Sequence, residues 1–441
     1  MPETPPAAST AATILEDKIK SHQARVGIVG LGYVGLPLAV EFAKAGFDVT
    51  GIDVNEEKTR CVNRGESYVG DIPTAILAPL VEAGRLRATT DFSTIRNLDT
   101  VNICVPTPLR KTKDPDMSYI VSSCQQIAHY IHTGMLVILE STTYPGTTDE
   151  LVLPMLAESG LQVGSDFFLC FSPERVDPGN PRYQTVNIPK VVGGCTAGCT
   201  EMGRLFYSQA LERVVPVGST RVAEMVKLLE NTFRMINIGL VNEMAMMCDR
   251  IGIDVWEVIE AAATKPFGFM AFYPGPGLGG HCIPIDPFYL SWKTRQAGIE
   301  ARFIELAGYI NGQMPDFVVD KVQNALNDAG KPVKGSRIHV MGVAYKRDID
   351  DLRESPALDV MLLLKRRGAI LSYSDPYVPQ LRIDDVKLES EPEQSAGAAD
   401  CVVIVTDHST FDYRALVERS TLIVDTRNAL KGLPLAKIVR L

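Results

Sequence analysis

The sequence lacks a basic surplus, a long apolar run and a secretory-type start, and each absence excludes a class of protein. Its formal charge is −9, so we expect no nucleic-acid partner. No apolar run approaches the roughly 20 residues of a transmembrane helix, so we expect no membrane partner. Residues 1–22 lack a basic start followed by an apolar core, and we expect a flexible tail there, although residues 13–22 could form a short helix.

Regular cysteine spacing is also missing. The nine cysteines are odd in number and scattered, which suits a reducing cytoplasm better than a disulfide framework. Cys195 and Cys199 are close in sequence, but no second pair or histidine cluster accompanies them. We therefore expect a cytoplasmic protein without a metal site.

Strands and helices alternate in the first part of the folded chain. Residues 25–29 are expected to form a buried strand, residues 32–45 a helix ended by Gly46, and residues 48–52 a second strand. Further runs of strand type occupy residues 100–106, 136–142 and 167–174. This alternation predicts an α/β fold with a parallel, doubly wound sheet.

A long helix and a second α/β region follow. Residues 221–251 keep one apolar stripe at helical spacing, and a helix of this length would connect domains or build a dimer core. The stripe consists of Val222, Met225, Val226, Leu229, Phe233, Ile236, Leu240 and Met244. After a helix at 315–329, alternation resumes, with Ser355 as the N-cap and Pro356 as the first residue of another helix, which Gly368 ends.

These patterns predict two Rossmann-like, doubly wound domains joined by a long central helix. The later strands are expected within residues 337–346, 369–376, 401–408 and 421–428. The expected parts are a flexible tail (1–22), a first Rossmann-like domain (23–215), a central helical domain with a cysteine loop (216–314) and a second Rossmann-like domain (315–441).

The stretch GLGYVG follows the first strand and opens the first helix. It places Gly30, Gly32 and Gly35 in the G-x-G-x-x-G spacing, and Asp53 ends the next strand. The glycines allow a pyrophosphate to approach a helix N-terminus, and an aspartate can accept hydrogen bonds from a ribose, which favours NAD over NADP. The alternative is a Rossmann-like domain that binds something else or nothing.

Hydroxyl and carboxyl groups follow three other strands. Thr107, Ser141 and Thr142 are expected to face the cofactor, because ligands gather beyond the carboxyl ends of parallel strands; turn or capping roles are the alternative. Glu174 could act as a general base or orient a water. It could equally pair with Arg175 or with another surface cation.

Lys227 and Asn231 lie four residues apart on the long helix and project from one face. A partly buried lysine can serve as an acid or a base. The alternative is a solvated face in which Glu224 or Glu230 is the partner of Lys227.

The loop YPGPGLGGHCIPIDPFYL (residues 273–290) surrounds a cysteine with glycine and proline. Gly277, Gly279 and Gly280 could place backbone N–H groups close to a ligand. Cys282 is then a candidate nucleophile, with Asp286 four residues later. An inert buried cysteine is the alternative, and a zinc site at His281 is disfavoured because Cys282 is its only soft neighbour.

Seven motifs occur in an order that resembles the UDP-glucose/GDP-mannose dehydrogenase family from about residue 25 to the C-terminus. They are VGIVGLGYVGLPLA, ESTTYPGTT, SPERVDPG, VKLLENTFR, GPGLGGHCIPIDP, GVAYKRDIDDLRESPA and VDTRN. The motifs GPGLGGHCIPIDP and SPERVDPG look closest to those of UDP-N-acetylglucosamine 6-dehydrogenases of bacterial surface-polysaccharide pathways. UDP-N-acetylmannosamine, UDP-N-acetylgalactosamine and UDP-glucose are the alternative substrates.

The resemblance implies oxidation of the sugar C6 alcohol to a carboxylate with two NAD⁺. It implies that Cys282 forms a thiohemiacetal and then a thioester, and that Lys227 and Asp286 handle the alcohol proton. Glu174 and Thr142 would position the hydrolytic water, and Asn231 would stabilise the oxyanion together with Lys227. The family's second glutamate is replaced by Pro178, and Asp177 is an unproven substitute.

The resemblance also implies cofactor and substrate contacts. The cofactor contacts are Gly30, Gly32, Gly35, Asp53, Lys58, Thr107, Thr142 and Arg353. The substrate contacts are Glu174, Lys227, Asn231, Tyr273, Gly277, Gly279, Lys346 and Arg427. The C-terminal domain would bind the uridine diphosphate, and relatives dimerise through the central helix.

Two rival functions remain open. A two-electron β-hydroxyacid dehydrogenase shares the first Rossmann domain and a Lys–Asn pair, but it does not predict the cysteine loop. A non-catalytic NAD-responsive regulator would treat Cys282 as a relic.

Overall fold

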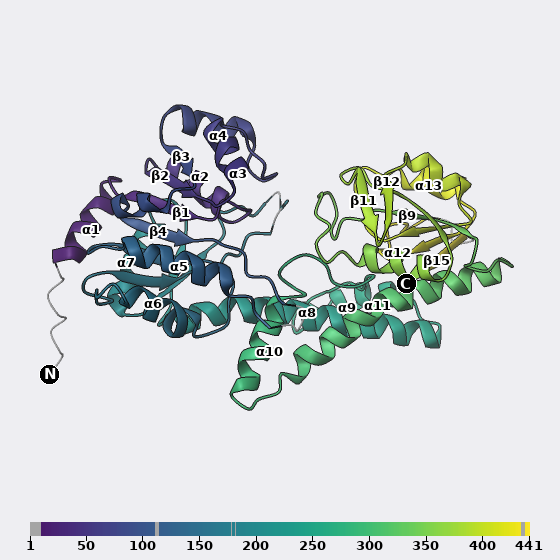
Figure 1. The fold of residues 1–441 in the computed structure, drawn as a ribbon. Helices are drawn as coiled ribbons and strands as arrows, with labels where there is room; N and C mark the ends of the chain where they lie inside the picture. The colour runs from purple at the N-terminus through teal and green to yellow at the C-terminus, as the bar shows by residue number, and fades with distance from the viewer. Residues whose placement is uncertain (1–9, 111–113, 178, 181, 434–436) are drawn as a thin grey trace. The chain divides into compact units, whose positions relative to one another are not determined.

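The computed structural model describes residues 10–110, 114–177, 179–180, 182–433 and 437–441. The chain divides into two compact units, Met1–Glu230 and Asn231–Leu441, and each unit has its own parallel-strand sheet (Figure 1). The predicted α/β class with two Rossmann-like sheets is confirmed. The four predicted domain boundaries stay a prediction.

The first unit is built on an eight-stranded sheet with the order β3-β2-β1-β4-β5-β6-β7-β8. Neighbouring strands are parallel except β6 and β7, which are antiparallel. The strands are β1 (Arg25–Val29), β2 (Asp48–Ile52), β3 (Leu86–Thr89), β4 (Thr100–Ile103), β5 (Leu136–Leu139), β6 (Phe168–Phe171), β7 (Lys190–Gly194) and β8 (Val214–Pro216).

Helices cover both faces of this sheet, which explains why β4, β5 and β6 are buried along their whole length. In β5, Leu136 and Ile138 belong to one apolar cluster, whereas Val137 and Leu139 belong to the cluster on the opposite face. The helices are α1 (Thr10–Lys20), α2 (Gly35–Lys44), α3 (Glu56–Asn63), α4 (Thr74–Glu82), α5 (Ser118–Tyr130), α6 (Leu153–Ala157) and α7 (Ala197–Tyr207), with a 3₁₀ turn at Phe92–Asn97 and a π-helical turn at Thr148–Val152.

Helix α1 confirms the alternative of a short helix near residues 13–22 and contradicts a flexible tail from residue 10 onward. Leu15 and Ile19 are fully buried in the cluster that also holds Phe206 of α7, and the ring of His22 stacks on Phe47. A single apolar pair one helical turn apart gives this short segment enough buried surface to pack. Residues 1–9 lie outside the described part of the chain.

Helix α8 (Thr220–Ile251) confirms the predicted long helix and continues from the first unit into the second. The predicted apolar stripe is largely exposed in the single chain, with Leu229 60% and Leu240 52% exposed. An exposed apolar face of this length is compatible with a dimer core, and the dimer stays a prediction.

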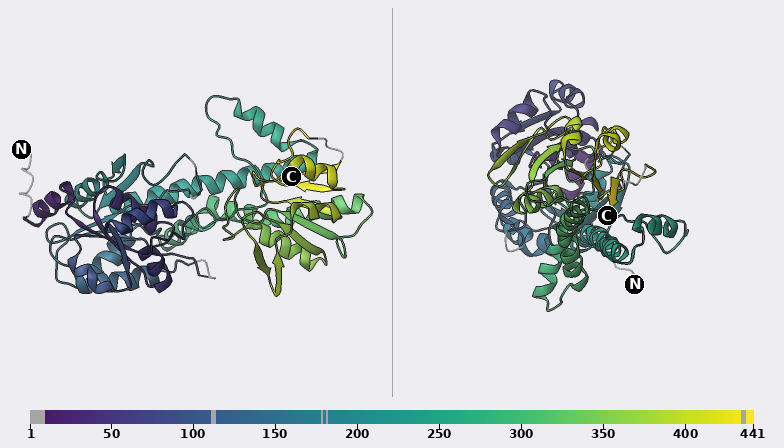
Figure 2. Two further views of the ribbon diagram at one scale, coloured as in Figure 1. Left: turned by 90° about the horizontal axis from the view of Figure 1, so that it is seen from above. Right: turned by 90° about the vertical axis from the view of Figure 1, so that its right-hand side faces the viewer.

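The second unit carries a parallel five-stranded sheet with the order β10-β9-β13-β14-β15 and a separate antiparallel hairpin, β11–β12. Its helices pack on both faces of the sheet (Figure 2). The elements are α9 (Val255–Ala263), α10 (Asp286–Gln296), α11 (Arg302–Asp328), β9 (Arg337–Met341), α12 (Pro356–Arg366), β10 (Ile370–Ser374), β11 (Gln380–Ile383), β12 (Val386–Glu389), a 3₁₀ turn (Glu393–Ala398), β13 (Cys401–Ile404), α13 (Tyr413–Arg419), β14 (Ile423–Asp425) and β15 (Ile438–Arg440).

Two helix predictions in this unit had different outcomes. The predicted cap is confirmed, because the Ser355 hydroxyl accepts the N–H of Ala357 at the start of α12. The predicted start of a helix at Pro315 is wrong, because α11 begins at Arg302 and runs through Pro315. Buried residues on both sides of the proline, such as Ile310 and Val318, stabilise the continuous helix despite the lost N–H.

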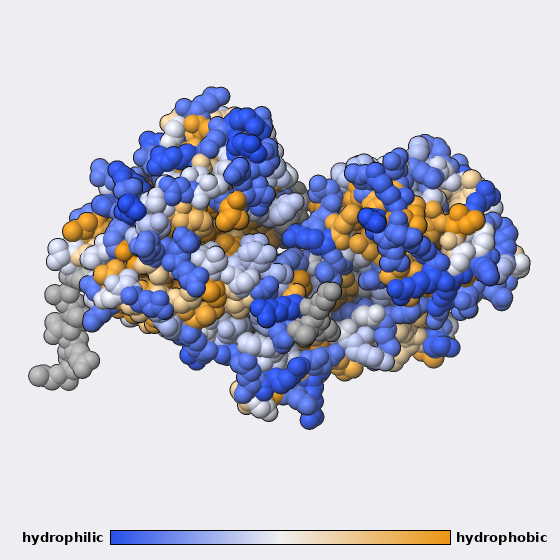
Figure 3. Space-filling model, in the orientation of Figure 1, coloured by the Kyte–Doolittle hydropathy of each residue, from blue (hydrophilic) through white to orange (hydrophobic). Residues whose placement is uncertain are grey.

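Polar residues dominate the surface of each unit seen in Figure 3.

Candidate active site

Each glycine in the turn between β1 and α2 is needed there for a different structural reason. Gly30 has a φ of 93°, and a Cβ there would lie 2.6 Å from the carbonyl oxygen of Cys104. A Cβ at Gly35 would lie 1.8 Å from the carbonyl oxygen of Gly30, so the helix packs on the turn only with glycine. Gly32 has open space around its Cβ position, which leaves room for a pyrophosphate at the start of α2.

Asp53 lies at the carboxyl end of β2 and is held by the same turn. Its Oδ2 accepts the N–H of Leu31 (2.8 Å), its Oδ1 accepts the N–H of Asn55 (2.9 Å), and Lys58 Nζ lies 3.6 Å from Oδ2. A cavity of about 630 Å³ is lined by Gly30, Asp53 and Lys58, among other residues. The open turn, the carboxylate and the cavity fit the adenosine half of NAD.

The hydroxyls expected to face the cofactor have different surroundings. Thr107 is buried just beyond Val105 and Pro106, which line the cavity. The Ser141 hydroxyl donates to the carbonyl of Val105 (2.7 Å), so it holds two strand ends together. This contact supports the turn role of Ser141, and its expected cofactor role stays a prediction. Thr142 instead meets a catalytic candidate.

Lys227 is buried and donates to Thr142 Oγ1 (2.5 Å). The solvated-face alternative for Lys227 is therefore wrong. Glu224, one turn earlier on α8, accepts the N–H of Gly146 (2.5 Å) and the N–H and hydroxyl of Thr148 (2.9 and 2.7 Å). Two side chains of α8 thus fix the loop that carries Thr142 from both ends. Burial, only partly offset by these hydrogen bonds, raises the pKa of Glu224 to about 7.

Glu174 is held as a carboxylate by a cation that the sequence reasoning missed. Lys190 Nζ lies 3.2 Å from its Oε2, and the N–H groups of Arg175 and Val176 donate to Oε1 (both 2.8 Å). The guanidinium of Arg175 binds Glu230 (2.6 Å), so the side-chain pair with Arg175 is not formed. Burial raises the pKa of Glu174, but Lys190, the N–H of Val176 and Lys227 together hold it below its ordinary value.

The cysteine loop ends at a buried Asn–Asp pair. Asn231 Nδ2 donates to Asp286 Oδ2 (2.7 Å), and both residues are buried. Asp286 is the first residue of α10, and its N–H donates to the carbonyl oxygen of Cys282 (2.8 Å). The half-buried Cys282 therefore precedes α10 by one turn, on a loop fixed to α8 through Asn231. The structure brings Cys282, Asp286 and Asn231 together.

The glycines before Cys282 allow close packing inside the second unit. A Cβ at Gly279 would lie 2.6 Å from the Cβ of Tyr345, and Gly277 has a φ of 140°. The N–H of Gly280 donates to the carbonyl of Arg353 (2.9 Å). This corrects the expectation that Gly280 offers its N–H to a ligand. Gly275 is anchored separately, because its N–H donates to Asn242 (2.9 Å), which in turn donates to Asn311 (2.8 Å).

The remaining predicted substrate and cofactor residues lie at several places in the second unit. Tyr273 is half exposed and stacks on Trp256 with ring centroids 6.2 Å apart. Arg353 forms a bidentate pair with Asp351, Arg427 Nε lies 3.5 Å from Asp407, and Lys346 is half-buried. Asp177 accepts from Asn180 (3.3 Å), while Pro178 lies outside the described residues. The proposed substitution of Asp177 for a second glutamate stays a prediction.

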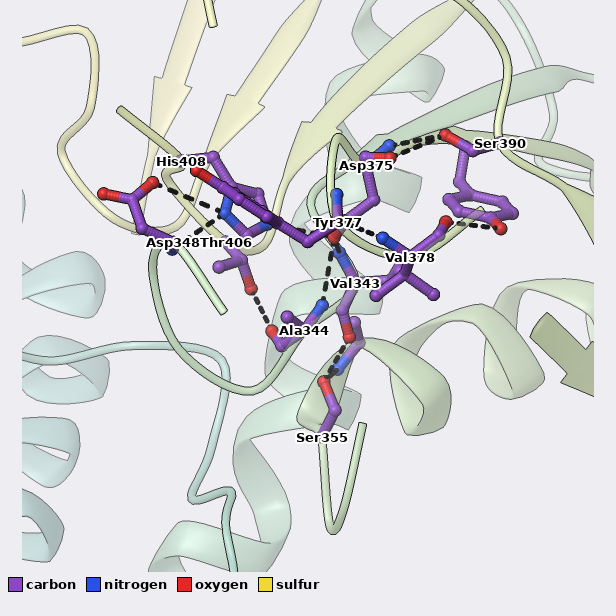
Figure 4. Close-up of polar contacts among 12 residues, drawn as sticks. Val343, Ala344, Asp348, Ser355, Asp375, Tyr377, Val378, Ser390, Thr406 and His408 are labelled. Atoms are coloured by element: carbon purple, nitrogen blue, oxygen red, sulfur yellow. Dashed lines mark hydrogen bonds and ion pairs between the residues drawn. The ribbon is translucent and has the colours of Figure 1, made fainter. Parts of the chain in front are cut away.

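A buried His–Asp pair lies at the carboxyl edge of the second sheet (Figure 4). His408 Nε2 lies 2.9 Å from Asp375 Oδ2, and the N–H of Asp348 donates to His408 Nδ1 (2.9 Å). The same Asp375 oxygen accepts the N–H groups of Val343 and Ala344 (2.7 and 3.2 Å). The pair therefore fixes the chain that leads from β9 to Tyr345 and Lys346. Sequence reasoning missed it because its members are far apart in the chain.

Two kinds of feature are absent from the described residues. No group of three or more His, Cys, Asp or Glu side chains suited to a metal ion occurs among them. None of the described helices combines the length and the apolar character needed to span a bilayer.

Three family models match this chain. They describe the NAD binding domain (residues 24–211), the central domain (221–313) and the UDP binding domain (339–432) of the UDP-glucose/GDP-mannose dehydrogenase family. A UDP-N-acetyl-D-mannosamine dehydrogenase of Pyrococcus horikoshii is 35% identical over 424 residues, 94% of this chain and 98% of that one. One of Escherichia coli (strain K12) is 36% identical over 405 residues, 88% and 94% of the two chains.

A solved structure shows the same similarity. It is that of a UDP-D-ManNAc dehydrogenase from Pyrococcus horikoshii, with a TM-score of 0.86 and 33% identity, covering 94% of this chain and 98% of that chain. The likeness therefore extends over both sheets and the helices that follow the first of them.

Proposed function

From the membership of this chain in the UDP-glucose/GDP-mannose dehydrogenase family, which its matches along almost the whole length establish, we propose that it oxidises UDP-N-acetyl-D-mannosamine at C6. The chain is an NAD-dependent oxidoreductase of nucleotide sugars. The proposed product is the uronic acid, formed by a four-electron oxidation with two NAD⁺. The observation that carries the chemistry is the buried Asn231–Asp286 pair beneath the Cys282 turn.

The choice of sugar rests on the relatives. The sequence motifs favoured UDP-N-acetylglucosamine, whereas similar proteins from both an archaeon and a bacterium act on the mannosamine epimer by name. The two sugars differ only at C2, so a loop motif around Cys282 does not distinguish them. UDP-N-acetylmannosamine is therefore the leading substrate, and UDP-N-acetylglucosamine, UDP-N-acetylgalactosamine and UDP-glucose are the alternatives.

Each NAD⁺ would supply, when bound, the acceptor for one of the two hydrides. Gly30, Gly32 and Gly35 would hold its pyrophosphate at the start of α2, and Asp53 its ribose hydroxyls. Lys58 and Thr107 are assigned to the same cofactor, as are Thr142 and Arg353. The support for Asp53 and Lys58 is that both line the cavity beside the glycine turn.

The first oxidation requires a path for the proton of the C6 alcohol. We assign this path to Lys227 and Asp286, acting through water. Both side chains are buried, and Lys227 is oriented by Thr142 while Asp286 is oriented by Asn231. Fixed orientation matters because a proton acceptor works only within hydrogen-bond reach of the reacting hydroxyl.

The second oxidation needs the thiol. The Cys282 thiolate attacks the aldehyde carbon, and a C–S bond forms while the carbonyl becomes an oxyanion. Asn231 and Lys227, one turn apart on α8, are assigned to stabilise this oxyanion. The covalent bond retains the aldehyde until its oxidation to a thioester, a task that a two-electron dehydrogenase does not have.

Hydrolysis of the thioester is assigned to Glu174 and Thr142. The ionised Glu174 accepts a proton from the attacking water, and the Thr142 hydroxyl positions that water. The pKa of Glu174 lies below its ordinary value, so the group is a carboxylate at neutral pH. This supports its role as the proton acceptor. Tyr273, Gly277, Gly279, Lys346 and Arg427 are proposed to contact the nucleotide sugar, the cations offsetting the diphosphate charge.

We also propose a homodimer through the exposed apolar face of α8. Sedimentation equilibrium tests this state, and a monomer at micromolar concentration would contradict it.

The experiment that tests the substrate is an NADH assay over the four UDP-sugars at equal concentration. The proposal predicts the highest kcat/KM for UDP-N-acetylmannosamine. A preference of tenfold or more for UDP-N-acetylglucosamine would return the assignment to the sequence-based expectation. Absence of NADH with all four would contradict the enzyme function and favour a regulatory protein.

A further inference from the structure

A buried charge cluster lies behind Glu174. Lys190, the first residue of β7, contacts Glu140 Oε2 at 2.6 Å and Glu174 Oε2 at 3.2 Å. The side chains of Lys190, Glu140 and Glu174 are only 6%, 0% and 10% exposed. One ammonium therefore bridges two carboxylates almost without solvent, a regime in which each charge strongly affects its neighbours.

The sheet itself brings these groups together. β6 and β7 are antiparallel with Phe171 opposite Gly193, and continuing that register by three residues sets Glu174 opposite Lys190. Glu140 directly follows the neighbouring strand β5. The position of the ammonium is thus fixed by strand pairing rather than by a flexible side chain on the surface.

The far side of the cluster is closed by neutral groups. Asn102 Nδ2 and the Tyr207 hydroxyl donate to Glu140 Oε1 (2.6 and 2.7 Å). Burial first and Glu140 second raise the pKa of Tyr207, so the phenol stays neutral. Burial lowers the pKa of Lys190, but the two carboxylates outweigh it and raise that pKa, so the ammonium stays charged. The charged ammonium of Lys190 therefore lies between the carboxyl groups of Glu140 and Glu174.

We propose that Lys190 and Glu140 form a positioning pair that sets the charge and orientation of Glu174 for thioester hydrolysis. This inference rests on the hydrolytic role given to Glu174 in the proposed function. Neither Lys190 nor Glu140 touches the reacting atoms in this account, and both act through Glu174.

The hydrogen bonds to the two carboxylate oxygens of Glu174 set the orientation of its side chain. Two backbone N–H groups occupy Oε1 of Glu174, and within the described residues Lys190 is the hydrogen-bond donor to Oε2. A carboxylate oxygen accepts two hydrogen bonds, so Oε2 keeps a lone pair for water. In the assigned step the water oxygen attacks the thioester carbon, its proton passes to Glu174 Oε2, the C–S bond breaks and Cys282 leaves as the thiolate.

The charge of Glu174 depends on the charged groups that surround it. The titratable and charged groups around Glu174 are Lys190 on β7, Lys227 on α8, Glu140 after β5, Cys104 after β4 and the adjacent Arg175, which is paired with Glu230. Lys190 stabilises the ionised form of Glu174, and Glu140 opposes it by like-charge repulsion. Removing each member of the pair should therefore move the pKa of Glu174 in opposite directions.

The test compares Glu140→Gln, Lys190→Met and the double variant with the parent. The pKa of Glu174 is measured in the free enzyme by ¹³C NMR of labelled glutamate side chains, with Glu174→Gln identifying the resonance. We expect a fall of about one unit in Glu140→Gln and a rise of about two units in Lys190→Met. The double variant should lie between them.

Lys18→Met is the matched control, because Lys18 pairs with Asp99 elsewhere in the same unit. It should leave the pKa of Glu174 unchanged. If Lys190→Met does not fold, Glu140→Gln decides alone, because it keeps the ammonium in place. Shifts in one common direction, or no shift in Glu140→Gln, would overturn the proposal even if the enzyme turns over UDP-sugars normally.

A second readout separates positioning from structure. Single-turnover release of the uronic acid should show an acid limb that moves with the measured pKa of Glu174 in each variant. The rate of the first oxidation should stay within about threefold of the parent, since that step does not use Glu174. An acid limb that stays fixed while the pKa moves would contradict the role in hydrolysis.

Discussion

The two sheets of the molecule begin with the same turn and use it differently. β1 leads to Gly30 (φ 93°) and β9 to Gly342 (φ 75°), and in each sheet an aspartate follows the second strand. Asp53 Oδ2 accepts the N–H of Leu31, and Asp375 Oδ2 accepts the N–H of Val343, in both sheets the residue after that glycine. The backbone geometry of a dinucleotide-binding turn is therefore present twice.

The difference lies in what occupies the aspartate. His408 binds Asp375, whose side chain is completely buried, whereas Asp53 borders a cavity with Lys58. Because the N–H of Asp348 donates to His408 Nδ1, the ring proton sits on Nε2 and points to Asp375. The equivalent aspartate thus borders an open cavity in the first sheet and accepts internal hydrogen bonds in the second.

Among changes to the two aspartates, the largest expected effect is a loss of protein stability. Asp375→Ala leaves the buried N–H groups of Val343, Ala344 and Val378 and the ring of His408 without their acceptor, and we expect a loss of about 4 kcal/mol in unfolding free energy. Urea unfolding measures it. A loss below about 1 kcal/mol would show that the hydrogen bonds to Asp375 contribute little to stability.

The two units should also respond oppositely to pH. Burial lowers the pKa of His339 on β9 to about 4. The neutral ring then contributes stability above the unfolded pKa, and about 3 kcal/mol is lost as pH falls through the folded pKa. Glu224 in the first unit has a raised pKa of about 7, so its contribution is present below its unfolded pKa and is lost as pH rises through 7.

Hydrogen exchange of peptides from each unit, measured between these pH limits, checks this contrast. Glu224→Gln should remove the loss at rising pH from the first unit only, and His339→Asn should remove the loss at falling pH from the second only. The same pH response in both units would refute the assignment of these two groups.

A smaller effect is expected on cofactor affinity. Asp53→Ala should weaken NAD binding about 30-fold, because a charge-assisted hydrogen bond to the ribose is lost. Asp375→Asn, a milder change at the equivalent position of the second sheet, should leave NAD affinity within about twofold of the parent. Calorimetric titration with NAD measures both, and equal losses would contradict the division of roles between the two aspartates.

Much of this framework could be predicted from local patterns. The glycine spacing, Asp53, helix α8 and the Ser355 cap depend on residues close together in the chain, so periodicity and capping rules suffice. The absence of a helix or strand before Cys282 could also be predicted, because glycine and proline crowd around that residue.

The rest depends on contacts that sequence distance hides. Lys190 meets Glu174 only through the antiparallel register of β6 and β7, and His408 meets Asp375 across the second sheet. Helix α1 was underestimated because its stability comes from packing rather than from its own propensity. The sugar epimer is set by contacts around C2, which no motif of this chain identifies.

The most direct test of the central claim is the number of NADH molecules formed per UDP-N-acetylmannosamine consumed. A cysteine-dependent four-electron oxidation predicts two, with the uronic acid as product and no acid formed by Cys282→Ala. A yield of one NADH, or unchanged acid formation in Cys282→Ala, would contradict the account.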